Sequence, residues 1–323
     1  MALALKALFD KRSRAMTRAK LRAWWEGESF DEAAALAEIA ANDPGGADDE
    51  LFDPPEFDMP PRLAALGVLW GAGRVRPGDD AADALEPARL GATGEGRIAV
   101  LGPGLHAPVA AFASAHAGPI DVFEWREETV DALKHGVLCA KLDARVTVTR
   151  IDLEAHVWTP ASFDGLWSVD DFAYCAFPPH LAQQIMKALK PGACAVVDAY
   201  VGVRCAEFAT AFASSFAEPQ IRAHGDVLQV FADTGLVLEA DEDLTDEFLE
   251  TARRNFKQLA EGMAEAAKLD VAAVRELAWE AEAWRMRLKL LTQRRLERRR
   301  FVLRKPAEDG PQAEAENANA PAG

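Results

Sequence analysis

Residues 98–108 have the sequence IAVLGPGLHAP, in which four apolar residues run into a glycine turn. The apolar run predicts a strand over 98–101, and the segment beginning at Pro108 has a helical pattern. Glycine permits positive φ and close approach of the backbone to a ligand. The start of the following helix offers unpaired N–H groups and the positive end of its dipole. The stretch therefore predicts a ligand-binding loop between Leu101 and Pro108.

Acidic residues close the next two predicted strands. Glu124 follows Gly104 by 20 residues, and a carboxylate there can accept two hydrogen bonds from a ribose diol. Asp152 lies just past the third strand, where an acid can receive the amino group of an adenine. Read as Gly-x-Gly-x-x-Ala followed by an acid, the pattern also fits a nicotinamide dinucleotide enzyme. Against that alternative, pyrophosphate needs a glycine where His106 stands, and the chain shows no recognisable set of hydride-transfer residues.

Strand-like and helix-like segments alternate through the middle of the chain. Strands are expected at 98–101, 120–124, 146–151, 165–168 and 193–201, with helices at 108–116, 127–138 and 180–189. A strand at 236–240, two long amphipathic helices within 248–263 and 271–291, and a last strand at 301–303 follow. This alternation predicts an α/β, doubly wound, mostly parallel sheet with helices on both faces.

In this order the segments resemble the class I S-adenosylmethionine-dependent methyltransferases. Residues 98–108 resemble the glycine-rich first motif, 121–125 the second strand with its ribose-binding acid, and 146–154 the third motif. Residues 163–168 resemble the fourth strand, and the Leu-Lys-Pro-Gly turn at 189–192 leads into the fifth. The stretch Leu69-Trp70-Gly71-Ala72-Gly73, with Pro77-Gly78 after it, is similar to the segment that precedes the first motif in small-molecule methyltransferases.

The resemblance implies a Rossmann-like, seven-stranded sheet whose last strand is antiparallel, and S-adenosylmethionine as cofactor. The cofactor contacts it implies are Leu101, Gly102, Pro103, Gly104, Glu124, Trp125, Asp152, Leu153 and Ser168. Two positions depart from the family, which usually has an acid at Val100 and a glycine at His106. We expect the His106 side chain to point into the space of the methionine moiety. Either departure can weaken cofactor binding or mark a relative that has kept the fold and lost the chemistry.

Three residues are candidates for catalysis. Asp170 and Asp171 lie just past the fourth strand, at the edge where open α/β sheets bind ligands, and can face an amine or orient a hydroxyl. The alternative is that they cap the next helix or turn. His106 is a candidate base, against a role in filling the loop.

Composition and charge disfavour several classes of protein. The 323 residues carry a net charge of −16, which disfavours nucleic acid as a partner. The four cysteines form no C-x-x-C pair, no metal site is expected, and no run of apolar residues is long enough to span a membrane. The basic run of the N-terminus follows its apolar residues, the reverse of a signal peptide, so we expect a cytoplasmic protein.

Charge and proline divide the chain into segments. Residues 1–27 predict a basic helix, 28–61 an acidic linker rich in Pro and Gly, 62–305 the methyltransferase-like domain and 306–323 a disordered tail. Within the domain we expect 62–96 to be a helical lead-in, 97–202 the cofactor-binding half and 203–305 the half with the long helices and last strands. The basic helix can dock on the domain, bind a protein partner or lie on a membrane surface. The Arg and Lys residues between 285 and 300 are expected to form a solvated face.

The first functional hypothesis is a methyltransferase acting on a small-molecule or lipid-like acceptor. The second is a non-catalytic protein of the same fold with a binding or regulatory role, peripheral to a membrane through residues 1–27. A nicotinamide oxidoreductase is the third.

Overall fold

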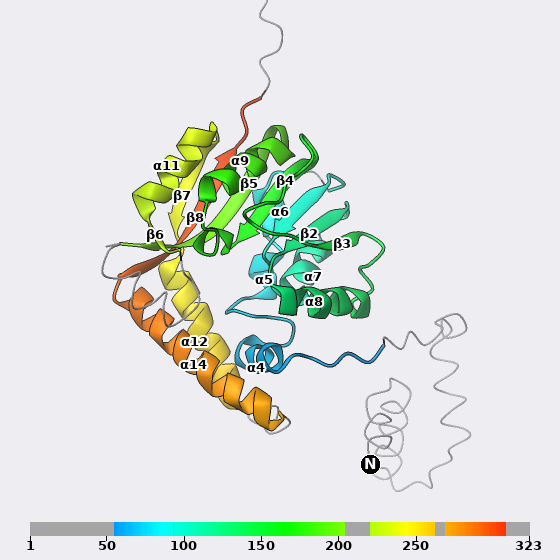
Figure 1. Ribbon diagram of the computed structural model, residues 1–323, viewed down its shortest axis with the longest axis vertical. Coiled ribbons are helices and arrows are strands. Elements are labelled where there is room, and N and C mark those ends of the chain that lie inside the picture. Colours follow the sequence, from blue (N-terminus) through cyan, green and yellow to red (C-terminus); the bar gives the residue numbers. More distant parts are fainter. Residues whose placement is uncertain (1–54, 93, 204–219, 262–268, 308–323) are drawn as a thin grey trace, which may run out of the picture. The chain divides into compact units, whose positions relative to one another are not determined.

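The computed structural model describes residues 55–92, 94–203, 220–261 and 269–307. The chain divides into two compact units, Met1–Pro55 and Glu56–Gly323, and the described helices and strands belong to the second (Figure 1). The predicted basic helix (1–27) and almost all of the predicted tail (306–323) lie outside the described residues.

One sheet organises the second unit. Its strands are β1 (Ile98–Leu101), β2 (Ile120–Glu124), β3 (Val146–Arg150), β4 (Phe163–Val169), β5 (Leu189–Gly202), β6 (Arg222–Ala223), β7 (Val237–Asp243) and β8 (Leu296–Arg304). The order is β3-β2-β1-β4-β5-β8-β7, with β6 paired to β5. Among the described strands, β8 runs antiparallel to both β5 and β7, and the other pairs are parallel. The doubly wound α/β fold is confirmed, with one correction to the strand count: the two-residue β6 makes this an eight-stranded sheet.

The helices lie on both sides of the sheet (Figure 1). Ahead of β1 come α4 (Pro61–Trp70), α5 (Asp80–Asp83) and α6 (Glu86–Arg89); later come α7 (His106–Ala115), α8 (Glu127–Cys139), the 3₁₀ turn η1 (Asp171–Ala173), α9 (Pro178–Ala188), α11 (His224–Thr234), α12 (Thr245–Glu261) and α14 (Val271–Thr292). None of the described helices is long and apolar enough to span a bilayer.

The apolar run of β1 is buried on both faces because successive side chains of a strand point to opposite sides. Ile98 and Val100 pack in the core cluster that includes Phe112 of α7, and Ala99 and Leu101 in the cluster that includes Ile185 of α9. A core on each face fixes the end of β1, and with it the glycine turn, at the carboxyl edge of the sheet.

The long helices α12 and α14 lie between β7 and β8 in the sequence, as predicted, and pack against α4. Trp70 of α4 is 1% exposed and makes edge contacts with Trp284 of α14 and Phe256 of α12, at ring-centroid distances of 4.8 and 5.0 Å. This cluster holds the segment after α4 close to the carboxyl edge of the sheet. That segment supplies Arg76, which reaches the glycine turn.

Strand β8 starts at Leu296 rather than at the predicted Phe301, which changes the role of two arginines. Arg298 and Arg300, expected on a solvated face, are each 5% exposed. The prediction was wrong for these residues because alternate side chains of β8 point to one covered face, where Arg298 and Arg300 meet buried carboxylates, while Arg299 on the other face is half-buried.

Candidate functional site

The glycine turn and the acid of the second strand meet at the carboxyl edge of the sheet. Gly102 and Gly104 have φ of 65° and 82°, values that favour glycine. The Gly104 N–H donates to Glu124 Oε2 at 2.9 Å. The structure therefore brings together the loop and the carboxylate that the sequence places 20 residues apart.

Glu124 is completely covered by the chain's own groups. Its Oε1 accepts from the backbone N–H groups of Trp125 (3.1 Å) and Arg126 (2.9 Å). The Arg126 guanidinium donates to both carboxylate oxygens, at 3.0 and 3.2 Å. With 0% exposure, the carboxylate reaches a ligand only when Arg126 moves away from it.

Arg126 also has aromatic neighbours. Its guanidinium carbon lies 4.1 Å from the centre of the Trp125 ring and 5.4 Å from that of Tyr174. The two rings contact each other with centroids 4.5 Å apart. These cation–π contacts, each worth about 0.5–1 kcal/mol or more when desolvated, favour the conformation in which Arg126 covers Glu124.

Asp171 lies beneath the first glycine of the turn. Its Oδ1 accepts from Trp125 Nε1 (2.9 Å), and its Oδ2 accepts from Ser168 Oγ (2.7 Å) and the Val169 N–H (3.1 Å). A Cβ on Gly102 would overlap Asp171 Oδ1. Burial raises the pKa of Asp171 to about 7. The carboxyl joins the end of β4 to Trp125, just after β2, and lies against Gly102; these bonds do not cap the turn that follows it.

Asp170 adopts the left-handed conformation, with φ of 70°, and is buried. It forms an ion pair with Arg298, and Arg76 Nε lies 4.0 Å from its other oxygen. The side chain makes no capping hydrogen bond to η1. Of the two candidate aspartates, Asp170 is therefore the one that belongs to a buried arginine network.

His106 starts α7, and its ring is enclosed by two glycines. Its ring packs between Gly136 of α8, where a Cβ would overlap it, and Gly73, where a Cβ would come within 2.7 Å of the ring. Burial and the nearby His135 lower the pKa of His106. Gly136 of α8 gives the ring room beside the turn that follows α4, and the expectation that His106 lies in the space of a methionine moiety stays a prediction.

The remaining predicted cofactor contacts differ in how exposed they are. Asp152 is exposed and accepts the Glu154 N–H at 2.9 Å, whereas Leu153 is 6% exposed and belongs to the hydrophobic core. Ser168 is fully buried at the end of β4. Its hydroxyl donates to Asp171, so it reaches the turn through that carboxyl.

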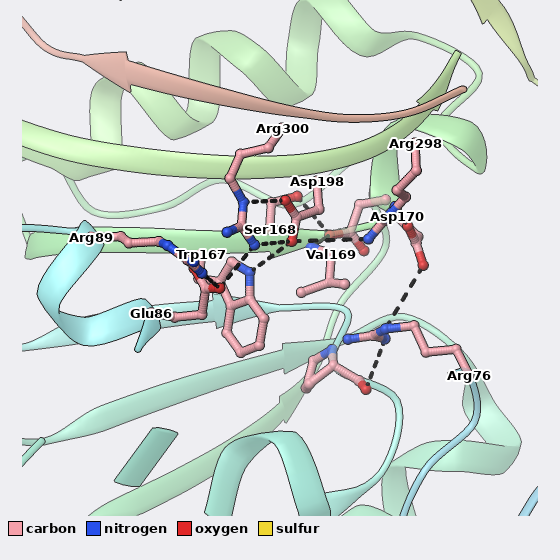
Figure 2. A network of polar contacts seen from close by, with 12 residues as sticks. Arg76, Glu86, Arg89, Trp167, Ser168, Val169, Asp170, Asp198, Arg298 and Arg300 are labelled. Atoms are coloured by element: carbon pink, nitrogen blue, oxygen red, sulfur yellow. Dashed lines mark hydrogen bonds and ion pairs between the residues drawn. The ribbon is translucent and has the colours of Figure 1, made fainter. Parts of the chain in front are cut away.

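Beside the turn lies a polar network that sequence reasoning missed (Figure 2). Arg300 donates to Asp198 of β5 at 2.7 and 2.8 Å and to Glu86 of α6 at 2.9 Å. Burial opposes ionisation of Asp198, but the charge and hydrogen bonds of Arg300 outweigh it and lower the pKa of Asp198. The available signal was the spacing of Arg298 and Arg300, which puts both side chains on one face of a strand.

The sequence matches no protein-family model, and a search of curated proteins finds no match. Solved structures do match. A phosphoethanolamine N-methyltransferase 2 of Haemonchus contortus, in complex with phosphomonomethylethanolamine and S-adenosylhomocysteine, has a TM-score of 0.64 and 20% identity over 76% of this chain and 57% of that one. The present chain thus spans little more than half of that enzyme's length.

Two further structures match over nearly their whole length. A putative sarcosine dimethylglycine methyltransferase from Galdieria sulphuraria has a TM-score of 0.64 and 15% identity, over 76% of this chain and 98% of that one. The [4+2]-cyclase SpnF has a TM-score of 0.60 and 17% identity, over 76% and 93%. Sequence identities of 15–20% show that these proteins share a fold with the present chain and do not show a shared function. The chain has the class I methyltransferase fold, on which the cyclase shows that other chemistry also occurs.

Proposed function

We propose that this protein is an S-adenosylmethionine-dependent methyltransferase that acts on a small-molecule or lipid-like acceptor. The observation that carries the proposal is the hydrogen bond from the Gly104 N–H to Glu124, which joins the turn after β1 to the acid at the end of β2. The order of the strands and the solved methyltransferases of this fold, crystallised with S-adenosylhomocysteine or S-adenosylmethionine, support it.

The residues present fit such a cofactor in kind and in position. Glu124 would accept from the ribose hydroxyls, and the backbone of Gly102 and Gly104 allows close approach. The bound cofactor supplies an electrophilic methyl group. The chain's own contribution is to position the two reactants, since such a transfer depends mainly on orientation. In the described conformation Arg126 covers the Glu124 carboxylate, so binding requires that this ion pair opens.

A second function is favoured by that same ion pair. If Arg126 stays on Glu124, the protein is a non-catalytic member of the fold with a binding or regulatory role. The two guanidinium hydrogen bonds and the cation–π contacts of Arg126 would then hold the carboxylate closed against a weak ligand.

Calorimetry with S-adenosylhomocysteine distinguishes the two functions. For the methyltransferase we expect binding by the unchanged protein, at least tenfold weaker binding after Glu124→Gln, and equal or tighter binding after Arg126→Ala. Arg150→Ala removes an exposed ion pair with Glu127 and serves as the matched control, with no change expected. Absence of binding by both the unchanged protein and Arg126→Ala would support the non-catalytic role. Binding of a nicotinamide dinucleotide instead would select the oxidoreductase.

A further inference from the structure

A small cavity lies against the buried arginine network. It is half open to solvent and has a volume of about 100 Å³. Its wall combines Arg76, Glu86, Trp167, Asp198, Arg298 and Thr251, contributed by the segment after α4, by α6, β4, β5 and β8, and by α12. Since a water molecule takes up about 30 Å³ in the liquid, the space suits a few waters or a small polar group.

Among the described arginines of this wall, Arg76 is the one without a carboxylate at hydrogen-bonding distance. It is 8% exposed, and in the described part of the chain its guanidinium makes one hydrogen bond, from Nη1 to the Pro103 carbonyl at 3.1 Å. Asp170 is 4.0 Å away and already pairs with Arg298 (Figure 2). A guanidinium has five N–H donors, so Arg76 can bind a further acceptor that enters the cavity.

The buried part of the network has equal numbers of cationic and anionic side chains. The guanidiniums of Arg76, Arg298 and Arg300 face the carboxylates of Glu86, Asp170 and Asp198, and the exposed Arg89 pairs with Glu86 (Figure 2). Carboxylates at the rim are paired with other arginines, Asp83 with Arg74 at 2.6 Å and Asp79 with Arg254 at 2.8 Å. Glu247 lines the cavity from α12 but is exposed. An anion inside the cavity would therefore compete for Arg76 mainly with Asp170, whose Oδ2 lies 4.0 Å from Arg76 Nε.

We propose that this cavity binds an oxyanion, a carboxylate or a phosphate group, through the Arg76 guanidinium. A guanidinium matches the planar, two-oxygen geometry of both groups. The cavity adjoins the glycine turn, because Arg76 contacts Pro103 within that turn. The acceptor of the methyl group is therefore a small molecule with a carboxylate or a phosphate; this last step rests on the proposed function, whereas the anion site does not.

The test uses the full chain without any cofactor. Thermal unfolding and calorimetry are recorded with sodium phosphate and, separately, sodium acetate, each against sodium chloride at equal ionic strength. We expect one or both anions to raise the melting temperature beyond the effect of chloride. A response to phosphate alone identifies a phosphate ester as the ligand class, and a response to acetate alone identifies a carboxylate.

Variants test whether the anion binds in the cavity at Arg76. Arg76→Gln is expected to weaken anion binding at least tenfold, whereas Arg97→Gln, which removes an exposed arginine paired with Asp121, is expected to leave it unchanged. Thr251→Phe narrows the cavity from α12 and should weaken binding with Arg76 intact, which keeps the test decisive if Arg76→Gln fails to fold. No response beyond chloride, or binding unchanged by Thr251→Phe, would overturn the proposal. S-adenosylhomocysteine binding is measured separately, so failure of the anion site and failure of the proposed function are distinguishable.

Discussion

Gly102 shows how one residue couples the turn to the sheet. Its positive φ and the Asp171 carboxyl beside it leave no room for a side chain. Gly192 has a similar φ of 76° but has no atom within 4 Å of the position where a Cβ would be built. Comparing substitutions at Gly102 and Gly192 therefore separates the cost of the left-handed backbone conformation from the cost of displacing Asp171.

Gly102→Ala is expected to lower the free energy of unfolding well beyond the loss caused by Gly192→Ala. The control should lose about 1–2 kcal/mol, the cost of a left-handed conformation for an L-residue. Gly102→Ala adds displacement of the hydrogen-bonded Asp171. Urea unfolding of both variants measures the difference, and equal losses would mean that Asp171 yields without cost.

Glu86 is a buried carboxyl whose protonation should affect stability. It is 2% exposed; Oε1 is shared by Arg89 and Arg300, and Oε2 accepts no hydrogen bond in the described part of the chain. Burial, opposed by Arg300 and reinforced by Asp198, raises its pKa from 4.5 to about 7. Between those values the folded state keeps a proton that the unfolded state loses, so stability falls as the pH rises.

Glu86→Gln should remove this pH dependence because the amide stays neutral. From pH 4.5 to pH 8 the unchanged protein should lose stability relative to the variant by an amount on the order of 2–3 kcal/mol. Chemical unfolding of both proteins at several pH values measures the difference. A constant difference across this range would show that Glu86 titrates normally.

At the scale of elements, strand β8 connects the sheet to the buried arginine network. The strand presents Arg298 and Arg300 to Asp170, just after β4, and to carboxylates on β5 and α6. Arg304, the last residue of the same strand, instead forms an exposed ion pair with Glu239. One strand thus carries both a buried and a surface ion pair.

Arg300→Gln should destabilise the fold by about 3–5 kcal/mol, since it leaves Asp198 and Glu86 buried without their shared cation. Arg304→Gln, the matched control in the same strand, should cost about 1 kcal/mol or less. Melting temperatures and urea midpoints of the two variants provide the comparison. Similar effects for both would contradict the structural role given to the buried network.

Much of this architecture could be predicted because the signals for it lie in short stretches of consecutive residues. The apolar runs of β1 and β2, the glycine turn and the acid after β2 are each contained in a few consecutive residues. The arginine network could not be found in this way, because Arg300 and Asp198 are 102 residues apart in sequence. Nor could the orientation of His106, which depends on Gly136 in another helix, or the pairing of Arg126 with Glu124, which competes with a ligand.

At the scale of the whole molecule, the second compact unit, Glu56–Gly323, contains the described elements of the fold and of the proposed site. For residues 1–27 we propose contact with a membrane surface or a protein partner, on the basis of their basic charge and tryptophans. Vesicles containing anionic lipid should pellet the full chain at low salt but not the chain that begins at Glu56. Equal pelleting of both would contradict the membrane contact.

The central claim is that one adenosyl-containing molecule binds between the glycine turn and Glu124. Hydrogen–deuterium exchange of the full chain, with and without saturating S-adenosylhomocysteine, tests it directly. The account predicts slower exchange confined mainly to residues 101–107 and 123–127. Unchanged exchange in both segments, or protection located only elsewhere in the chain, would contradict it.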